Sequence, residues 1–132
     1  MTLVEADRAA AQVIRKNMAG WGADEQLEVL ECTVEHARGA LSQRGPIDLV
    51  LADPPWKVAG AAALSVARTV HGLLATDARV VLGHPAREAL SLDAASGLLV
   101  VSCRTWGDSA LSFLTPRASS AAGTAVPEAG AP

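Results

Sequence analysis

The chain has 132 residues, enough for one domain built around a single hydrophobic core. Hydrophobic residues make up 50%, charged residues 19%, and the formal net charge is −3, so bulk charge gives no support for nucleic-acid binding. No apolar stretch approaches the roughly 18 residues of a membrane span, and the acidic first residues lack a signal-peptide pattern, so we expect a cytoplasmic protein. The two cysteines, Cys32 and Cys103, form no metal-binding pair, and we expect both to be buried thiols.

Strands and helices alternate from the first residues onward. A short apolar run at residues 2–4 predicts a strand that stops at Glu5, and Asp7 can cap the helix that follows. A strand at residues 27–30 and a short helix at residues 34–41 come next. The predicted inner face of the first helix carries apolar residues at helical spacing: Ala10, Val13, Ile14 and Met18.

The second half of the chain continues this alternation and then changes character. The apolar run at residues 47–52 is nearly continuous, which suits a strand covered on both faces. An alanine-rich helix over residues 59–74 and a buried strand over residues 78–82 follow. Two strand-like runs, GLLVVSCRTW and SALSFLT, are then separated by Gly-Asp, which predicts an antiparallel hairpin because glycine accepts positive φ.

The order of elements predicts an α/β domain over residues 1–116, followed by a disordered tail at residues 117–132, which has no large apolar side chain beyond one valine. Alternating strands and helices with buried strands imply a mostly parallel sheet with helices on both faces. Ligands of such sheets bind beyond the carboxyl ends of the strands. Glu5 and Asp53 both fall at such ends.

The stretch DLVLADPPW ends a predicted strand in Asp53, Pro54, Pro55 and Trp56. The two prolines stiffen the exit from the strand, so the Pro54 carbonyl becomes an acceptor with a well-defined position. Asp53 adds a second acceptor and Trp56 a flat aromatic face. Together they can hold the exocyclic amino group of a stacked base and favour its pyramidal, more nucleophilic form, which could attack a methyl sulfonium. The alternative is a turn in which the prolines only end the strand and Trp56 packs.

Three stretches in order resemble the RsmD-type family of bacterial methyltransferases, which act on guanine N2 of small-subunit (16S) ribosomal RNA: LVEADRAAAQVIRKN, DLVLADPPW and CRTWGDSALSFL. The likeness covers about residues 2–115. Asp-Pro-Pro-aromatic alone is shared with adenine methyltransferases of DNA and RNA, whereas the final R-x-W-G-D-S points to this family. The implied fold is a Rossmann-like class I methyltransferase sheet that binds S-adenosylmethionine (AdoMet), mostly parallel, with a C-terminal antiparallel hairpin.

The resemblance also implies roles for residues that match the family's motifs. Glu5 would accept hydrogen bonds from the AdoMet ribose, as a carboxylate at a strand end does in nucleotide-binding folds. Thr33 would stand near the adenine, where the family commonly has Asn or Asp. The four residues of the Asp-Pro-Pro-Trp motif (residues 53–56) would hold the guanine amino group.

Three further residues are weighed against plainer interpretations. Lys57 and Arg104 are candidate contacts for RNA phosphates, with solvated surface charges as the alternative. His84 follows Gly83 near the end of a strand where family members often carry Glu, and we expect a loop residue rather than a catalytic base. The resemblance implies no metal.

The family's first strand, its glycine-rich AdoMet loop of the form D-x-F-A-G-S-G and its basic N-terminal segment do not occur in this sequence. By the resemblance, the first strand lies at the centre of the sheet, so we expect an incomplete sheet in which two strands face a gap with unpaired backbone groups. Three explanations stay open: a misplaced gene start, a frameshifted or truncated gene, and a fragment completed by a missing N-terminal segment or a partner chain.

The function implied by the resemblance is AdoMet-dependent methylation of guanine N2 in 16S ribosomal RNA, impaired in the chain as written. Its partners would be ribosomal RNA or the small-subunit particle, with no membrane involved. One alternative is a non-catalytic fragment or RNA-associated remnant, favoured by the missing loop and the negative charge. A second alternative is an adenine-N6 nucleic-acid methyltransferase, which the closing R-x-W-G-D-S disfavours.

Overall fold

The computed structural model describes residues 1–117, so most of the predicted tail (residues 118–132) lies outside the part of the chain described here. The predicted alternation of strands and helices and the closing hairpin are confirmed, with a longer fourth strand and a shorter third helix than expected. The elements in chain order are β1 (Thr2–Glu5), α1 (Arg8–Gly20), β2 (Glu28–Glu31), α2 (Val34–Ser42), β3 (Ile47–Ala52), the 3-10 turn η1 (Trp56–Val58), α3 (Ala59–Val70), β4 (Leu74–Pro85), the 3-10 turn η2 (Ala94–Ser96), β5 (Leu98–Trp106) and β6 (Ser109–Pro116).

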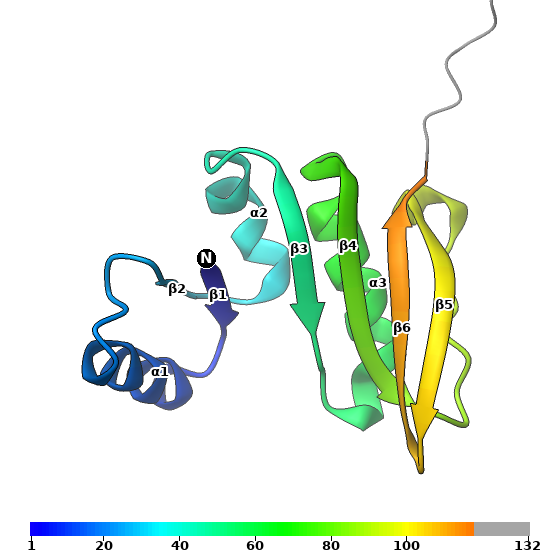
Figure 1. The fold of residues 1–132 in the computed structure, drawn as a ribbon, viewed down its shortest axis with the longest axis horizontal. Helices are drawn as coiled ribbons and strands as arrows, with labels where there is room; N and C mark the ends of the chain where they lie inside the picture. The colour runs from blue at the N-terminus through cyan, green and yellow to red at the C-terminus, as the bar shows by residue number, and fades with distance from the viewer. Residues whose placement is uncertain (118–132) are drawn as a thin grey trace, which may run out of the picture.

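The strands form two sheets rather than one continuous sheet (Figure 1). β1 pairs in parallel with β2, and the other four strands form a sheet in the order β3-β4-β6-β5. β3 and β4 are parallel, while β6 runs antiparallel to both of its neighbours. β1 and β3 point the same way in Figure 1, yet the two strands are not hydrogen-bonded to each other. The α/β class and the expected gap in the sheet are therefore confirmed.

The main hydrophobic core lies between α3 and one face of the four-stranded sheet. Val80, Leu82 and Leu114 are fully buried there, and α3 covers them with its small side chains. Because successive side chains of a strand point to opposite faces, Leu49 and Leu51 of β3 point away from this core. Their side chains are 56% and 69% exposed. Our expectation that both faces of this strand are covered is therefore wrong.

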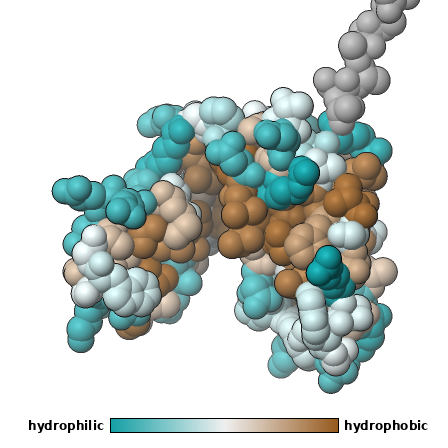
Figure 2. Space-filling model, viewed as in Figure 1, coloured by the Kyte–Doolittle hydropathy of each residue, from teal (hydrophilic) through white to brown (hydrophobic). Residues whose placement is uncertain are grey.

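Figure 2 shows the consequence for the surface, with hydrophobic residues gathered on the sheet face turned away from α3. The strand registers pair Val81 with Phe113 on this outer face. Both of these side chains are only half-buried. Together with Leu49 and Leu51 they make an apolar outer face that runs across β3, β4 and β6.

The smaller unit, β1–α1–β2, has little interior of its own. Ala11 and Met18 of α1 are buried, but Val13, expected on the inner face, is 58% exposed. Asp7 caps α1 as expected, since its Oδ1 accepts a hydrogen bond from the Ala10 amide at 2.7 Å. This unit thus depends more on local hydrogen bonds than on a packed core.

Helix α2 ties the two units together. Nη1 of Arg38 donates to the carbonyls of Thr69 (2.6 Å) and His71 (2.8 Å) at the end of α3. The last carbonyls of a helix have no partner within the helix and favour a cation, so Arg38 satisfies groups that α3 leaves open. Just beyond α2, Arg44 forms an ion pair with Glu28 of β2.

The two cysteines are less buried than we expected. Cys103 is exposed on β5 and Cys32 is half-buried, so the expectation of two buried thiols is wrong. No helix within residues 1–117 combines the length and apolar character needed to cross a bilayer.

Candidate active site at the carboxyl ends of the strands

The Asp-Pro-Pro-Trp motif forms the exit from β3. The strand ends at Ala52, and the chain turns into η1, where the Val58 amide donates to the Pro55 carbonyl at 3.0 Å. Asp53 is exposed and Trp56 is 45% exposed, so the carboxylate and one part of the indole are accessible to a ligand. The Pro54 carbonyl accepts no hydrogen bond from residues 1–117. Two acceptors and an accessible aromatic side chain therefore occupy one strand end.

The carboxylate of Asp53 lies directly against Gly83 of the neighbouring strand β4. A β-carbon built on Gly83 would be 3.0 Å from Asp53 Cγ and closer still to Oδ1. The pairing of Ala52 with Leu82 explains this position, because it sets the next residues of the two parallel strands side by side. Sequence reasoning placed Gly83 near a strand end but did not connect it with Asp53.

His84 lies in β4 and is buried, so the expectation of a loop residue is wrong. Its Nδ1 is 3.0 Å from the Pro85 carbonyl oxygen and its Nε2 is 2.9 Å from Ser112 Oγ. A carbonyl can only accept, so Nδ1 carries the proton and Nε2 accepts from the Ser112 hydroxyl. With both ring nitrogens engaged, His84 bridges β4 and β6 and is not placed to act as a base.

Glu5 and Thr33 stand at the carboxyl ends of the β1–β2 pair, the same edge at which β3 ends. Oε1 of Glu5 accepts a hydrogen bond from the Asp7 amide at 2.7 Å, and its Oε2 makes no hydrogen bond with residues 1–117. The Thr33 hydroxyl lies 2.9 Å from His36 Nδ1 at the start of α2. One free carboxylate oxygen and one hydroxyl suit the polar groups of a nucleoside.

The two candidate phosphate contacts lie at opposite edges of the four-stranded sheet. Lys57 is exposed in η1, next to Trp56 and the β3 edge. Arg104 is on β5, the other edge strand, with its guanidinium carbon 6.0 Å from the centroid of the Phe113 ring. The structure does not bring these two cations together.

The strand registers nevertheless put Arg104 level with Asp53. Leu111 of β6 pairs with Gly83 on one side and with Arg104 on the other. Residues directly opposite one another share a face of the sheet. Asp53, Gly83, Leu111 and Arg104 therefore form one row across the outer face, with the backbones of Asp53 and Arg104 about three strand spacings, or roughly 14 Å, apart.

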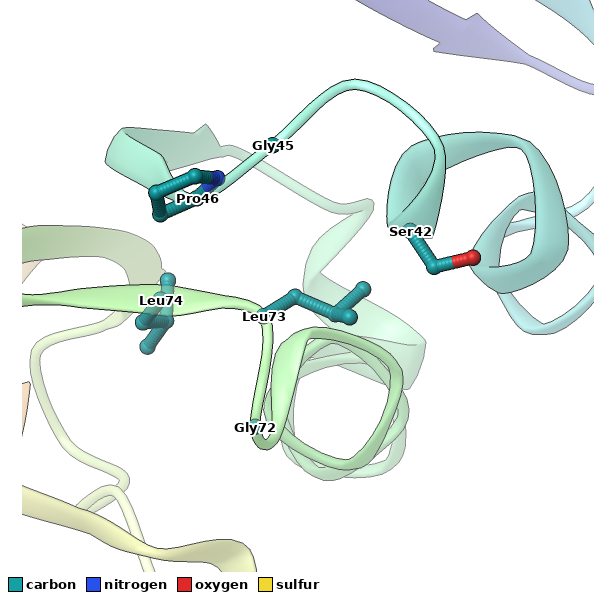
Figure 3. Close-up of a pocket in the computed structure, with 6 residues that line it drawn as sticks. All are labelled: Ser42, Gly45, Pro46, Gly72, Leu73 and Leu74. Atoms are coloured by element: carbon teal, nitrogen blue, oxygen red, sulfur yellow. The ribbon is translucent and has the colours of Figure 1, made fainter.

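A separate pocket of about 250 Å³ opens at the other end of the four-stranded sheet, where β3 and β4 begin (Figure 3). It has no ionisable side chain in its wall, so it offers no acid–base chemistry. It is also remote from the strand ends that carry Asp53. Its lining residues are Ser42, Gly45, Pro46, Gly72, Leu73 and Leu74.

Comparisons with known proteins agree on the fold. The family model described as "Conserved hypothetical protein 95" matches residues 1–115. No curated protein matches the chain. Among solved structures, a conserved hypothetical protein from Streptococcus pyogenes is 24% identical, with a TM-score of 0.68, and the match covers 87% of this chain and 70% of that one.

Two further structures carry names that bear on activity. The protein yhhF from Escherichia coli, proposed to be a methyltransferase, is 24% identical with a TM-score of 0.64, and the match covers 87% of this chain and 61% of that one. An rRNA methylase from Streptococcus thermophilus is 12% identical with a TM-score of 0.66, and the match covers 87% of this chain and 72% of that one. At these identities the likeness shows the fold alone, that of class I methyltransferases, and this chain spans about two thirds of the length of these structures.

Proposed function

Because this chain belongs to the conserved hypothetical protein 95 family, the RsmD-type family that its motifs resemble, we propose that it forms the target-recognition part of an AdoMet-dependent methyltransferase. The proposed target is the exocyclic N2 of guanine in small-subunit ribosomal RNA, in the cytoplasm. The observation that carries the proposal is the exit from β3, where the Asp53 carboxylate, the Pro54 carbonyl and an accessible Trp56 stand together.

The chemistry follows from these three groups. The two N–H bonds of the guanine amino group would donate to Asp53 and to the Pro54 carbonyl, while the base stacks on the indole. Both hydrogen bonds favour the pyramidal amine, whose lone pair becomes available to attack. Bound AdoMet supplies a methyl group on a positively charged sulfur. As the N–C bond forms, the bond between the methyl group and sulfur would break and leave its electron pair on sulfur, which becomes neutral. The amine loses one proton, which the Asp53 carboxylate can accept or pass to solvent.

The residues present fit one side of AdoMet. Glu5 has one carboxylate oxygen without a partner in residues 1–117, which can accept a ribose hydroxyl, and Thr33 can bond near the adenine. The sequence contains no glycine-rich loop to enclose the amino-acid part of the cofactor. We therefore assign the ribose and base side of the cofactor to β1 and β2, and assign no residue of this chain to the rest.

The partner proposed is RNA held by its backbone as well as by its target base. Arg104 lies in the same row of the outer face as Asp53, so a nucleotide held at Asp53 would run its chain toward the guanidinium. Lys57 lies beside the base position itself. The structural neighbour named as an rRNA methylase supports an RNA substrate for this fold.

The test is transfer of an isotope-labelled methyl group from AdoMet to unmodified small-subunit particles or 16S RNA. It is run on this chain alone and on a version extended at its N-terminus with the first strand and glycine-rich loop of a family member. Asp53→Ala should abolish transfer while AdoMet affinity in the extended version stays nearly unchanged. Near-normal turnover of Asp53→Ala would contradict the role given to the carboxylate.

An adenine-N6 activity is the second candidate, because the acceptor pair at the end of β3 would hold any exocyclic amino group on a base. Substrates distinguish the two. Methylation of adenine in RNA or DNA, with none on guanine N2, would favour the second candidate and displace the first.

A further inference from the structure

We propose that Gly83 is a positioning residue that lets the Asp53 carboxylate stand over β4, an inference that rests on the proposed function. Gly83 does not touch the substrate in this account. Its role is to leave empty the space that the carboxylate occupies, so that the acceptor stands over the outer face of β4.

With the carboxylate in this position, there is no room for a β-carbon at position 83. A β-carbon there would lie 3.0 Å from Asp53 Cγ, a tight contact, and it would be nearer to Oδ1 than real β-carbons approach other atoms. The same β-carbon would lie 3.4 Å from Asp53 Cα, an ordinary van der Waals distance. The conflict therefore involves the side chain of Asp53 and not its backbone.

Strand β4 cannot relieve the conflict by moving. Gly83 pairs with Leu111 of β6, and the next residue, His84, is buried and bonded to Ser112. Just beyond the strand, the Ala86 amide donates to the Asp108 carbonyl at 2.7 Å. These contacts hold the backbone around Gly83 to β6 and to the β5–β6 turn.

The Asp53 side chain, by contrast, is exposed and can rotate. Rotation about χ1 moves a side chain between staggered positions at small cost, so Gly83→Ala should turn the carboxylate away from β4 without disturbing the fold. The Asp53 carboxylate and the Pro54 carbonyl could then no longer accept hydrogen bonds from the same amino group. Gly83→Ala should therefore act on target recognition as Asp53→Ala does.

The direct experiment measures the χ1 angle of Asp53 by three-bond couplings in isotope-labelled protein without ligand. Gly83→Ala should change these couplings to those of a different rotamer. The control is Gly60→Ala, because Gly60 lies near the start of α3, close in sequence to Trp56, and a β-carbon there would meet nothing within 4 Å. Unchanged Asp53 couplings in Gly83→Ala would overturn the inference.

Target recognition is measured with two short single-stranded RNAs that differ only in carrying guanosine or inosine, since inosine lacks the 2-amino group. The indole N–H signal of Trp56 reports binding. The unsubstituted chain should prefer guanosine by about fivefold or more, the worth of one net hydrogen bond. Gly83→Ala should lose this preference, and Gly60→Ala should keep it. The double variant, Asp53→Ala with Gly83→Ala, should bind guanosine no more weakly than Asp53→Ala alone.

The outcomes separate the two proposals. A changed χ1 with no guanosine preference in the unsubstituted chain would leave Gly83 as the residue that orients Asp53, and would refute the amine-holding function. A guanosine preference that survives Gly83→Ala would refute the inference alone.

Discussion

The four-stranded sheet and the β1–β2 pair contribute different residues to the proposed site, and they are built very differently. Asp53 stands on a sheet whose inner face is packed under α3, with Val80, Leu82 and Leu114 fully buried. Glu5 stands at the end of a two-stranded sheet, β1–β2. Helix α1, which packs beside this sheet, has two buried side chains, Ala11 and Met18. A lone pair of strands is marginal in water, whereas several strands packed against a helix are stable.

Because of this difference, we expect the target-binding side of the site to be rigid and the AdoMet-binding side to be flexible. Strand pairing fixes the backbone that carries the groups proposed to hold the target amine, and Gly83 leaves room for the carboxylate. The groups proposed to hold AdoMet stand on a unit that can open locally without unfolding the rest, as weakly packed regions do. Target recognition should therefore be pre-formed, while cofactor binding should carry a cost of ordering.

Core substitutions should give the largest contrast between the two units. Leu82→Ala removes a fully buried side chain from the main core and should lower the free energy of unfolding by about 2–5 kcal/mol. Met18→Ala should instead remove hydrogen-exchange protection from β1 and β2 and leave that of β4 and β6 unchanged. Chemical denaturation and hydrogen exchange measure the two effects. Equal global destabilisation by both changes would show that the units unfold as one.

Cofactor affinity should be the next largest effect. We expect this chain alone to bind AdoMet with a dissociation constant no tighter than about 1 mM, because only one wall of the site is present. Titration calorimetry measures this directly. Micromolar binding would contradict the expectation. In a version extended at its N-terminus with the first strand and glycine-rich loop of a family member, Glu5→Ala should weaken AdoMet binding, whereas Asp53→Ala should not.

A smaller effect is expected where α2 holds the end of α3. Arg38→Ala removes the donor to the Thr69 and His71 carbonyls and should cost about 1 kcal/mol of stability. The matched control is Arg68→Ala, because Arg68 pairs with Asp93 at 3.1 Å on an exposed surface and should contribute about 0–0.5 kcal/mol. Thermal unfolding of both variants tests the difference. A larger loss for Arg68→Ala would refute the capping role.

The smallest effect should come from acid acting on the link between the two units. The hydrogen bond and ion pair with Arg44 hold the pKa of the Glu28 carboxyl below its ordinary value of 4.5. A carboxyl whose pKa is lowered on folding contributes stability above its unfolded pKa and loses it as the pH falls through the folded value. Protection of β2 amides, corrected for intrinsic exchange, should therefore fall below about pH 4.5, and less so in Glu28→Gln. Equal pH dependence in both proteins would exclude this pair as the cause.

Much of the fold could be predicted because its signals are local. Periodicity and turn residues gave the order of elements, and the rule that ligands bind at strand ends singled out Glu5 and Asp53. The exposure of Leu49 and Leu51 could not be predicted in this way. A nearly continuous apolar run looks the same in a strand buried on both faces and in a strand with one open face.

The wrong prediction for His84 and the unforeseen contact of Gly83 with Asp53 have a common physical cause. Gly83, His84 and Pro85 follow an apolar run in a combination typical of a loop, yet all three lie within the strand. Their environment comes from β3 and β6, which are distant in sequence. A glycine that makes room for a carboxylate, and a histidine that bonds a serine 28 residues away, become recognisable only when the strands are placed side by side.

Within residues 1–117, one edge of β3 pairs with no strand, and this has a consequence for how the protein behaves at high concentration. An open strand edge beside exposed leucines can template pairing with another molecule, which in many proteins is the first step of aggregation. A net charge of −3 provides only weak repulsion between molecules. Solubility should thus depend on what occupies this edge. Any chain segment that pairs with β3 would protect the protein from aggregation, whether or not it also contributes to catalysis.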